Sequence, residues 1–223
     1  MKFTAFSVSA AALAAALLAV TPVAKADSVT ANVWIGGTSS SVPPAGSSIY
    51  STSPTDVIQI SNANPSGVLN FSSTTDTSLT SFLTTGINGM ANGNSITYLK
   101  GSDSGFNNSL FQLTGSTTLS NGTYTYQHDD GLVLYLNGVA VINEPGKTAA
   151  VPTSFTVCAS GCNTTAGTYS FVLDYAEVSG PPAVLQGNLP LTSATPEPGS
   201  FVLLGSGLLG MAGVLRRRMK MRS

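Results

Sequence analysis

Turn-forming dipeptides recur through the middle of this 223-residue chain and divide it into short segments. They are Asn64-Pro65, Asn92-Gly93, Asn121-Gly122 and Asn137-Gly138. Runs of β-branched and aromatic residues that favour strands lie at 57–60, 68–71, 95–99, 124–126, 132–136, 139–142, 154–157 and 168–175. So many short strands with frequent turns predict a mainly β fold, either a sandwich or a barrel.

The segment 76–87 departs from this β pattern. Leu79, Phe82, Leu83 and Ile87 stand at the spacing of one helix face, and Asp76 is available as an N-cap. We therefore expect a short helix within this segment.

The clearest local structure is a hairpin. The apolar runs Leu132–Leu136 and Val139–Ile142 are joined by Asn137-Gly138, a pair that favours a two-residue type I′ turn. Polar residues do not alternate with apolar ones in the first run, so we expect that strand to be buried on both faces.

The N-terminal residues 1–26 read as a secretory signal peptide. A basic start at Lys2 precedes a short apolar run, and Ala24-Lys25-Ala26 forms a small-residue site with cleavage expected before Asp27. The alternative is a retained N-terminal anchor. The apolar run is short for a membrane span.

The C-terminal segment has the composition of a membrane anchor. An uncharged stretch at 199–215 is at the short end of the length needed to cross a bilayer as a helix. Arg216, Arg217 and Arg218 follow it, and such a basic cluster is expected to stay cytoplasmic. The part of the chain before Pro196 would then lie outside that membrane.

Pro196, Glu197 and Pro198 precede this stretch, and the two prolines favour an extended, accessible backbone. The triplet, the apolar stretch and the basic end together, over 195–223, resemble the PEP-CTERM sorting signal of exosortase-processed bacterial proteins. The resemblance implies cleavage near the triplet by an exosortase-type membrane protease, transient anchoring in the membrane, and delivery to the cell surface or extracellular matrix. The alternative is an ordinary C-terminal anchor.

Charge is distributed unevenly along the chain. Between residues 27 and 198 lie only two of the nine basic residues, Lys100 and Lys147, but all ten acidic ones, so this span carries a net charge of −8. A domain of this sign is not expected to bind nucleic acid, although it can attract cations. Residues 27–194 have the length of one exported domain.

Two of these acidic residues, Asp129 and Asp130, are adjacent and stand between two predicted strands. Because neighbouring carboxylates repel each other, they need solvation or a compensating partner. One interpretation is a simple turn, since Asp-Gly at 130–131 is a common turn signal. The other is a site for a hard cation such as Ca²⁺, which prefers oxygen ligands and leaves positions open for sugar hydroxyls.

The residues around the pair resemble a PA14-type domain over about 110–186. The matching segments are Gly122–Thr125, Asp129–Gly131, Leu132–Leu136, Asn137-Gly138, Val139–Ile142 and Gly167–Phe171. This resemblance implies a β-sandwich or barrel-like module of a kind often attached to glycosidases, adhesins and toxins.

In the sugar-binding members of that family, two Asp residues joined by a cis peptide hold a Ca²⁺ ion that contacts carbohydrate hydroxyls. The matching positions here are Asp129 and Asp130. A loop after the last long strand supplies further ligands there, including an Asn side chain. In "AEVSGPP" the residue nearest that position is Glu177, which adds a third negative charge, and the loop's aromatic residue is replaced by Pro181-Pro182.

Three other residues bear on the site. His128, the only histidine, is interpreted as a surface residue at a strand end, although it could also be a ligand. Trp34 is interpreted as a core residue rather than a sugar-stacking one. Cys158 and Cys162 are the only cysteines, and after export they are expected to form a disulfide, with a CxxxC metal site as the alternative.

An enzyme is not expected. The chain has one histidine and no obvious nucleophile motif, and Asp129 and Asp130 are poorly placed to act across a cleft as glycosidase carboxylates do. Two readings remain. The first is a Ca²⁺-dependent module that binds exopolysaccharide or another glycan, and the second is a structural surface or matrix protein in which the acidic pair shapes a turn or holds a structural ion.

Overall fold

The computed structural model describes residues 28–191, apart from 39, 63–67, 75–77 and 87–91. Its strands are β1 (Ser28–Trp34), β2 (Asp56–Asn62), β3 (Asn70–Ser73), β4 (Asn94–Lys100), β5 (Ser109–Leu119), β6 (Gly122–Asp129), β7 (Gly131–Leu136), β8 (Val139–Glu144), β9 (Val151–Val157), β10 (Gly167–Glu177) and β11 (Ala183–Gly187). A short α-helix, α2 (Leu79–Thr84), and a 3₁₀ turn, η1 (Ser48–Ser51), complete it. The predicted mainly β fold class is confirmed.

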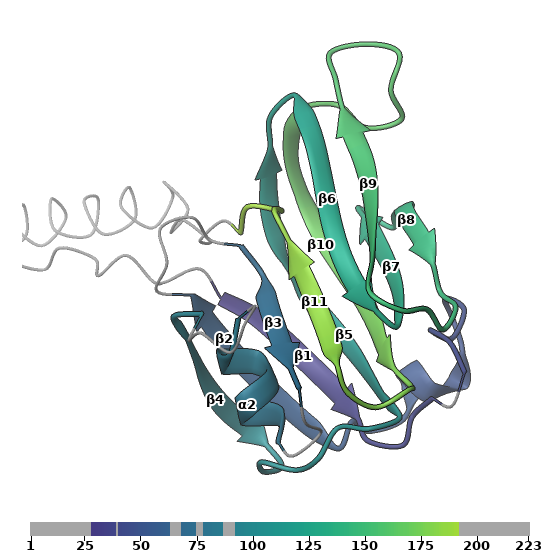
Figure 1. Cartoon of the computed structure of the whole chain (residues 1–223). Coiled ribbons are helices and arrows are strands. Elements are labelled where there is room, and N and C mark those ends of the chain that lie inside the picture. Colours follow the sequence, from purple (N-terminus) through teal and green to yellow (C-terminus); the bar gives the residue numbers. More distant parts are fainter. Residues whose placement is uncertain (1–27, 39, 63–67, 75–77, 87–91, 192–223) are drawn as a thin grey trace, which may run out of the picture. The chain divides into compact units, whose positions relative to one another are not determined.

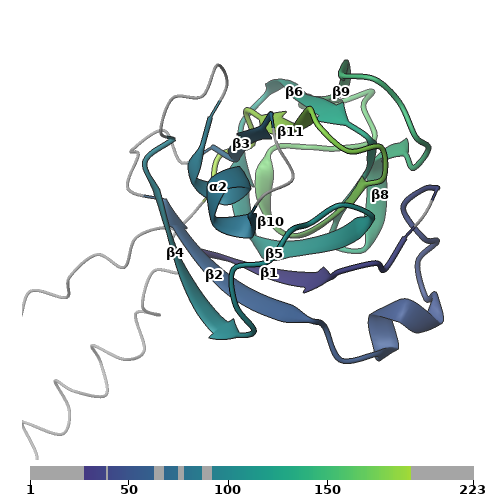
Figure 2. The same ribbon diagram turned by 60° about the horizontal axis from the view of Figure 1, so that its bottom comes forward.

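The strands form two antiparallel sheets that face each other (Figures 1 and 2). The larger has seven strands in the order β4-β2-β1-β5-β10-β7-β8, and the smaller has four in the order β3-β11-β6-β9. Helix α2 lies beside β3 and β4, where it covers one side of the space between the sheets (Figure 2).

The main core lies between the two sheets, because alternate residues of each strand point inward. Phe171, Leu173 and Tyr175 of β10 belong to it, together with Tyr126 of the smaller sheet and Phe82 of α2. The rings of Phe82 and Tyr175 stack with their centroids 5.9 Å apart. This aromatic packing joins the helix to the centre of the larger sheet.

The outer face of the larger sheet carries a second, smaller apolar cluster. Trp34 belongs to it and is 5% exposed, so its interpretation as a core residue is confirmed. Its ring meets that of Tyr50 edge-on, and its Nε1 donates to the Thr52 carbonyl at 3.3 Å. Val133 of β7 lies in this cluster while Leu132 and Leu134 lie in the main core, which confirms that β7 is buried on both faces.

All eight predicted strand runs coincide at least in part with observed strands. Strands β1, β5 and β11 are not among the predicted runs. β5 pairs with β1 on one side and with β10 on the other, so its Ser/Thr-rich half is held by long-range pairing rather than by an apolar sequence pattern. The predicted turn is also found: Asn137 and Gly138 both have positive φ, at 46° and 81°.

The predicted helix is present, with Leu79, Phe82 and Leu83 buried, whereas Ile87 lies outside the described residues. Its N-cap is Ser78, whose side chain accepts a hydrogen bond from the backbone N–H of Ser81 at 2.9 Å, and not the expected Asp76, which lies outside the described residues. No helix of the described residues is long and apolar enough for a membrane crossing. The expected signal peptide at 1–26 and span at 199–215 both lie outside them.

Candidate functional site

The acidic pair lies where the chain passes from one sheet to the other. β6 of the smaller sheet ends at Asp129 and β7 of the larger sheet begins at Gly131, so Asp130 alone joins them. The peptide bond between Asp129 and Asp130 is cis, as the sequence resemblance implied. A Cβ atom on Gly131 would come within 2.3 Å of the Pro145 carbonyl oxygen, so the close approach of that segment requires glycine.

Asp130 is fully buried, and its carboxylate is surrounded by hydrogen-bond donors. Oδ2 accepts from the backbone N–H groups of Val178 at 2.7 Å and Ser179 at 2.8 Å. Oδ1 accepts from the Ser179 hydroxyl at 2.8 Å and from the Thr148 N–H at 3.3 Å. Because a carboxylate offers about four acceptor positions, this set uses all of them. Asp130 thus connects the β6–β7 junction to two separate loops.

Asp129 has a different environment. It is buried, but less completely than Asp130, with 7% of the residue exposed. Burial and the negative charge of Asp130 raise the pKa of the Asp129 carboxyl to about 6, and the backbone N–H of Ala150 lowers it in part. Within the described residues no basic side chain contributes to this pKa, so the charge of Asp129 is poorly compensated.

Glu177 and Tyr175 lie behind the pair, inside the core. The Tyr175 hydroxyl donates to the Asp129 carbonyl oxygen, and it lies 3.0 Å from Glu177 Oε2. Both residues are fully buried. Burial, with the charge of Glu177 second, raises the pKa of Tyr175 well above its usual value, so this hydroxyl keeps its proton. Tyr175 therefore connects the backbone of the acidic pair with the Glu177 carboxyl group.

The interpretation of His128 as a surface residue is wrong. His128 is fully buried, because it lies on the inward face of β6 two residues after Tyr126. Its Nδ1 lies 2.5 Å from the Asp130 carbonyl oxygen. Since that oxygen can only accept, Nδ1 carries a proton, and Nε2 is buried with no hydrogen-bond partner among the described residues.

These residues fit a calcium ion only in part. Asp129 supplies a hard anionic oxygen near the surface, which is what Ca²⁺ prefers. Asp130 has no free acceptor position unless it releases a hydrogen bond, and the one from Thr148 is its longest. No group of three or more His, Cys, Asp or Glu residues suited to a metal is found among the described residues. Asp129, Asp130 and Glu177 stay predictions as metal ligands.

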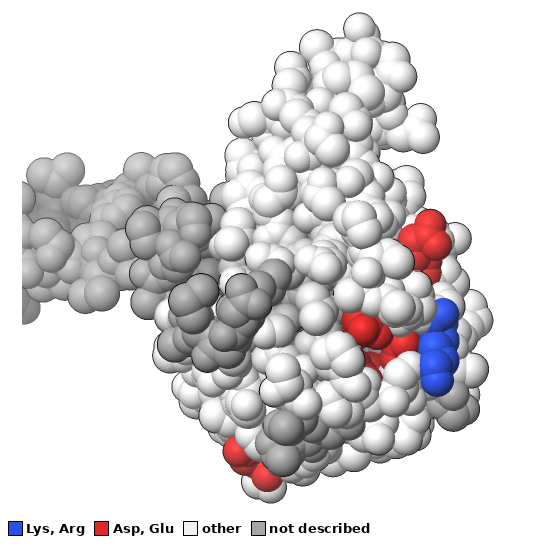
Figure 3. All heavy atoms as spheres, in the orientation of Figure 1, with Lys and Arg blue, Asp and Glu red and all other residues white. Residues whose placement is uncertain are grey.

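Figure 3 shows one face of the domain, on which acidic atoms lie in a recess with basic atoms beside them, whereas the upper end of the same face carries no charged atoms. A further buried carboxylate, Asp174, lies on the opposite face of β10, where it accepts hydrogen bonds from Gln112 and Tyr50, both at 3.1 Å. Burial raises its pKa, and these two partners lower it in part.

The remaining sequence-derived site residues are distributed elsewhere. Cys158 and Cys162 form a disulfide in the structure, with sulfur atoms 2.03 Å apart. The triplet Pro196–Pro198 and the basic residues Arg216, Arg217 and Arg218 lie outside the described residues. The sequence reasoning missed the residues that donate to Asp130, because nothing in their local sequence shows which acceptor they face. They are Thr148, Val178 and Ser179.

Comparison with known proteins gives a specific match at the C-terminal end. Residues 194–218 match the model of the PEP-CTERM protein-sorting motif. This motif indicates an exported protein that is processed at the membrane. No curated protein matches the chain.

Comparison of structures finds PA14 domains. The chain is similar to the PA14 domain of the MpAFP antifreeze protein, with 14% identity, a TM-score of 0.48, and coverage of 76% of this chain and 83% of that one. It is also similar to a PA14 sugar-binding domain from an RTX adhesin, with 20% identity, a TM-score of 0.46, and coverage of 73% and 87%. A β-glucosidase from Kluyveromyces marxianus is matched over only 16% of its length, with 13% identity, a TM-score of 0.32 and 76% of this chain covered. The chain thus carries a PEP-CTERM sorting motif after a mainly β domain that is similar to solved PA14 domains.

Proposed function

We propose that this protein is delivered to the cell surface or extracellular matrix by exosortase processing, and that its β domain binds carbohydrate there with the help of Ca²⁺. Its role is binding rather than catalysis. Asp129 and Asp130 would hold the ion, with Glu177 behind them. A bound Ca²⁺ supplies open coordination positions that the vicinal hydroxyls of a sugar can fill.

The observation that carries this proposal is the poorly compensated charge of Asp129. Burial and the negative charge of Asp130 raise the pKa of Asp129 to about 6, and no basic side chain of the described residues offsets this effect. A divalent cation would remove the repulsion and would favour the ionised form of the carboxyl group. Asp129 is 7% exposed, whereas Asp130 is fully buried, so a ligand would reach such an ion from the side of Asp129.

A second candidate function is favoured by a different observation. The carboxylate of Asp130 already has four hydrogen bonds from the protein, so it holds loops together without any metal. On this reading the pair shapes the junction between the sheets, and the domain is a structural component of the surface or matrix. The two functions differ in whether Ca²⁺ binds and remains accessible.

The two candidates are separated by titrating the exported protein with CaCl₂ in a calorimeter and then with a glycan panel in the presence and absence of Ca²⁺. We expect Asp129→Asn to abolish the heat of calcium binding and any calcium-dependent glycan binding. Glu144→Gln is the matched control, because it removes one exposed acidic charge from β8. Calcium binding without a glycan response would support a structural ion, and no calcium heat in the parent protein would overturn the calcium site.

Processing is tested separately, by intact-mass analysis of the protein recovered from outside the cell. We expect the mature protein to end near residues 196–198. The variant in which Pro196, Glu197 and Pro198 are all replaced by Ala should keep its C-terminal tail and stay with the membrane fraction. Recovery of exported protein with the complete tail would overturn the role of an exosortase-type protease.

A further inference from the structure

A cleft of about 610 Å³ opens at the end of the domain opposite the acidic pair. It is bounded by the β7–β8 turn, β8, β9, the loop after β9 and the start of β10. None of the residues that line it is Asp, Glu, Lys, Arg or His. Its size lies within the range of small-molecule sites, about 300–1,000 Å³. An uncharged lining favours an uncharged ligand, since a charged one would lose its hydration without a counter-charge.

Amide and hydroxyl groups supply the hydrogen-bonding capacity of this cleft. Asn137 is held in place because its Oδ1 accepts from both the backbone N–H and the hydroxyl of Ser170, at 2.9 Å and 3.0 Å. Its Nδ2 donors therefore point away from that contact and are available to a ligand. Asn163 and Thr156 also line the cleft and are exposed. The cleft thus offers several neutral donors and acceptors.

Aromatic rings supply its apolar surface. Tyr169 lines the cleft and is half-buried, and its hydroxyl donates to the Thr165 carbonyl at 2.8 Å, which fixes the ring. Phe155 also lines the cleft and stacks on Tyr124 with the ring centroids 5.4 Å apart. Fixed aromatic rings beside amides and hydroxyls match the surface of a pyranose sugar, which presents an apolar C–H face and a ring of hydroxyl groups.

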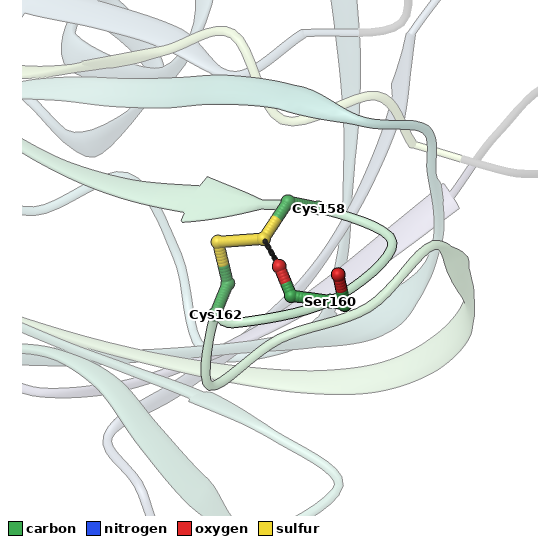
Figure 4. The surroundings of a disulfide bond; sticks show 3 residues. All are labelled: Cys158, Ser160 and Cys162. Carbon is green, nitrogen blue, oxygen red and sulfur yellow. Dashed lines mark hydrogen bonds between the residues drawn. A yellow bond between two sulfur atoms is a disulfide. The ribbon is translucent and has the colours of Figure 1, made fainter.

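The disulfide holds one wall of the cleft. Cys158 and Cys162 close a tight loop (Figure 4), whose residues Gly161 and Cys162 line the cleft, and Asn163 follows this loop directly. The backbone N–H of Cys158 also donates to the Thr164 carbonyl at 3.2 Å. Figure 4 shows the Ser160 carbonyl oxygen turned toward Cys158 Sγ, 3.0 Å away. Because a disulfide sulfur carries no proton, this is a close contact and not a hydrogen bond. A wall fixed in this way loses little entropy when a ligand binds.

An extended peptide fits the cleft less well than a sugar. The cleft lies between β8 and β9, each of which pairs with one strand only among the described residues. However, the β7–β8 pairing contains a register shift at Leu134/Tyr135, and Pro152 of β9 has no N–H to donate. Bulges and prolines are features that discourage the addition of a strand at a sheet edge.

We propose that this cleft is a binding site for a neutral saccharide and that it acts without calcium. The cleft is separate from the acidic pair, so this proposal can be tested independently of the calcium-dependent function proposed above. Tyr169 provides the stacking surface, and Asn137 and Asn163 provide hydrogen bonds to hydroxyl groups. A domain with both sites could bridge two glycan chains.

The test is NMR titration of the exported protein in EDTA with D-glucose, D-galactose, D-mannose, N-acetyl-D-glucosamine and cellobiose as probes. We expect saturable shifts of cleft amides with at least one probe at millimolar concentration. Tyr169→Ala and Asn163→Ala should each weaken that binding about tenfold or more. Tyr169→Phe should retain most of it, because the ring remains.

Two matched controls lie outside the cleft. Asn143→Ala changes an exposed amide of β8 that does not line it, and Tyr98→Ala removes a half-exposed ring from β4, so both should bind as the parent does. Asp129→Asn should also leave binding in EDTA unchanged. The proposal is overturned if no probe shifts the cleft amides, if binding requires Ca²⁺ and is lost in Asp129→Asn, or if an extended Ser/Thr-rich peptide perturbs the β8 and β9 amides while the sugars do not.

Discussion

The two ends of this sandwich are held together by opposite means. At the acidic end, residues 129–131 with the loops at 145–150 and 177–182, the buried carboxylate of Asp130 bonds to two loops at once. At the cleft end, residues 136–141, 154–164 and 169, the loop is fixed by a disulfide and the turn by Asn137, with no charge among the residues that line the cleft. The same strands β7 and β10 run between the two ends.

This difference has a physical consequence for how each end responds to its surroundings. A buried carboxylate network depends on protonation and on nearby cations, because both change the charge that its donors stabilise. A neutral, cross-linked end has no group of that kind. We therefore expect pH and metal ions to act on the acidic end, and redox conditions to act on the cleft end.

The strongest test of this comparison is Asp130→Ala. It leaves the buried N–H of Val178 and the donors of Ser179 and Thr148 without their acceptor, and each such loss costs about 1–3 kcal/mol. We expect the free energy of unfolding to fall by about 3 kcal/mol or more, as measured by denaturant titration in EDTA. Glu144→Gln should change it by less than about 0.5 kcal/mol. A similar small change for both variants would show that the carboxylate does not hold the loops.

Glycine substitutions compare the backbones of the two ends. Gly131→Ala would place a methyl group 2.3 Å from the Pro145 carbonyl oxygen, so we expect a loss of about 3 kcal/mol. Gly138→Ala at the β7–β8 turn has open space but a φ of +81°, so we expect a loss of only about 1 kcal/mol. The measurement is the same denaturant titration, and the reverse order of the two losses would contradict the close packing at the acidic end.

Removing the disulfide tests the cross-link at the cleft end. Because Cys158 and Cys162 are only four positions apart, the entropy that the bond removes from the unfolded chain is small. The double variant Cys158→Ser with Cys162→Ser should therefore lose about 2 kcal/mol or less. Thermal unfolding with and without a reductant gives the value, and the double variant should be insensitive to the reductant. A loss larger than that of Asp130→Ala would reverse the comparison.

The smallest expected effect is a pH dependence of the metal-free protein. The folded protein holds the pKa of Asp129 at about 6, above its ordinary value of about 3.9, so it binds this proton more tightly than the unfolded chain does. The resulting stabilisation is complete below the unfolded pKa and is lost as pH rises through about 6. In EDTA, the unfolding midpoint should therefore rise when the pH is lowered from neutral to 5.

Variants at both ends check this slope, which is the change of the unfolding midpoint with pH in EDTA. Asp129→Asn should flatten it only in part, because the raised pKa of Asp174 contributes with the same sign. Asn163→Ala at the cleft end should keep the parent slope, since Asn does not titrate. An unchanged slope in Asp129→Asn would mean that the pKa of this carboxyl is not raised in the folded protein.

Local signals in the sequence predicted much of the fold. Asn137-Gly138 specifies its own turn, and Leu79, Phe82 and Leu83 define a helix face without any knowledge of their partners. β5 was beyond the reach of such reasoning, because its Ser/Thr-rich half resembles a loop until β1 and β10 pair with it. The sequence offers Asp76 as a helix cap, whereas the structure uses Ser78, because several polar residues precede Leu79 and any of them can serve.

The site was predictable to a similar degree. Asp129 and Asp130 stand out because like charges rarely sit side by side between strands, but the donors that surround Asp130 come from residues 148, 178 and 179, and no local pattern connects them. The burial of His128 was available in principle from its alternation with Tyr124 and Tyr126. Because histidine is polar, the sequence analysis placed it at the surface in spite of this alternation.

The order of strands in the smaller sheet also sets a sequence of events in time. β11 lies between β3 and β6 and pairs with both, yet it is the last strand of the described chain. A chain that emerges from a membrane pore N-terminus first cannot complete this sheet until Ala183–Gly187 have emerged. Only residues 188–193 then separate that strand from the sorting motif at 194–218. If the protein is exported as proposed above, closure of the domain and arrival of its sorting motif at the membrane are therefore nearly simultaneous.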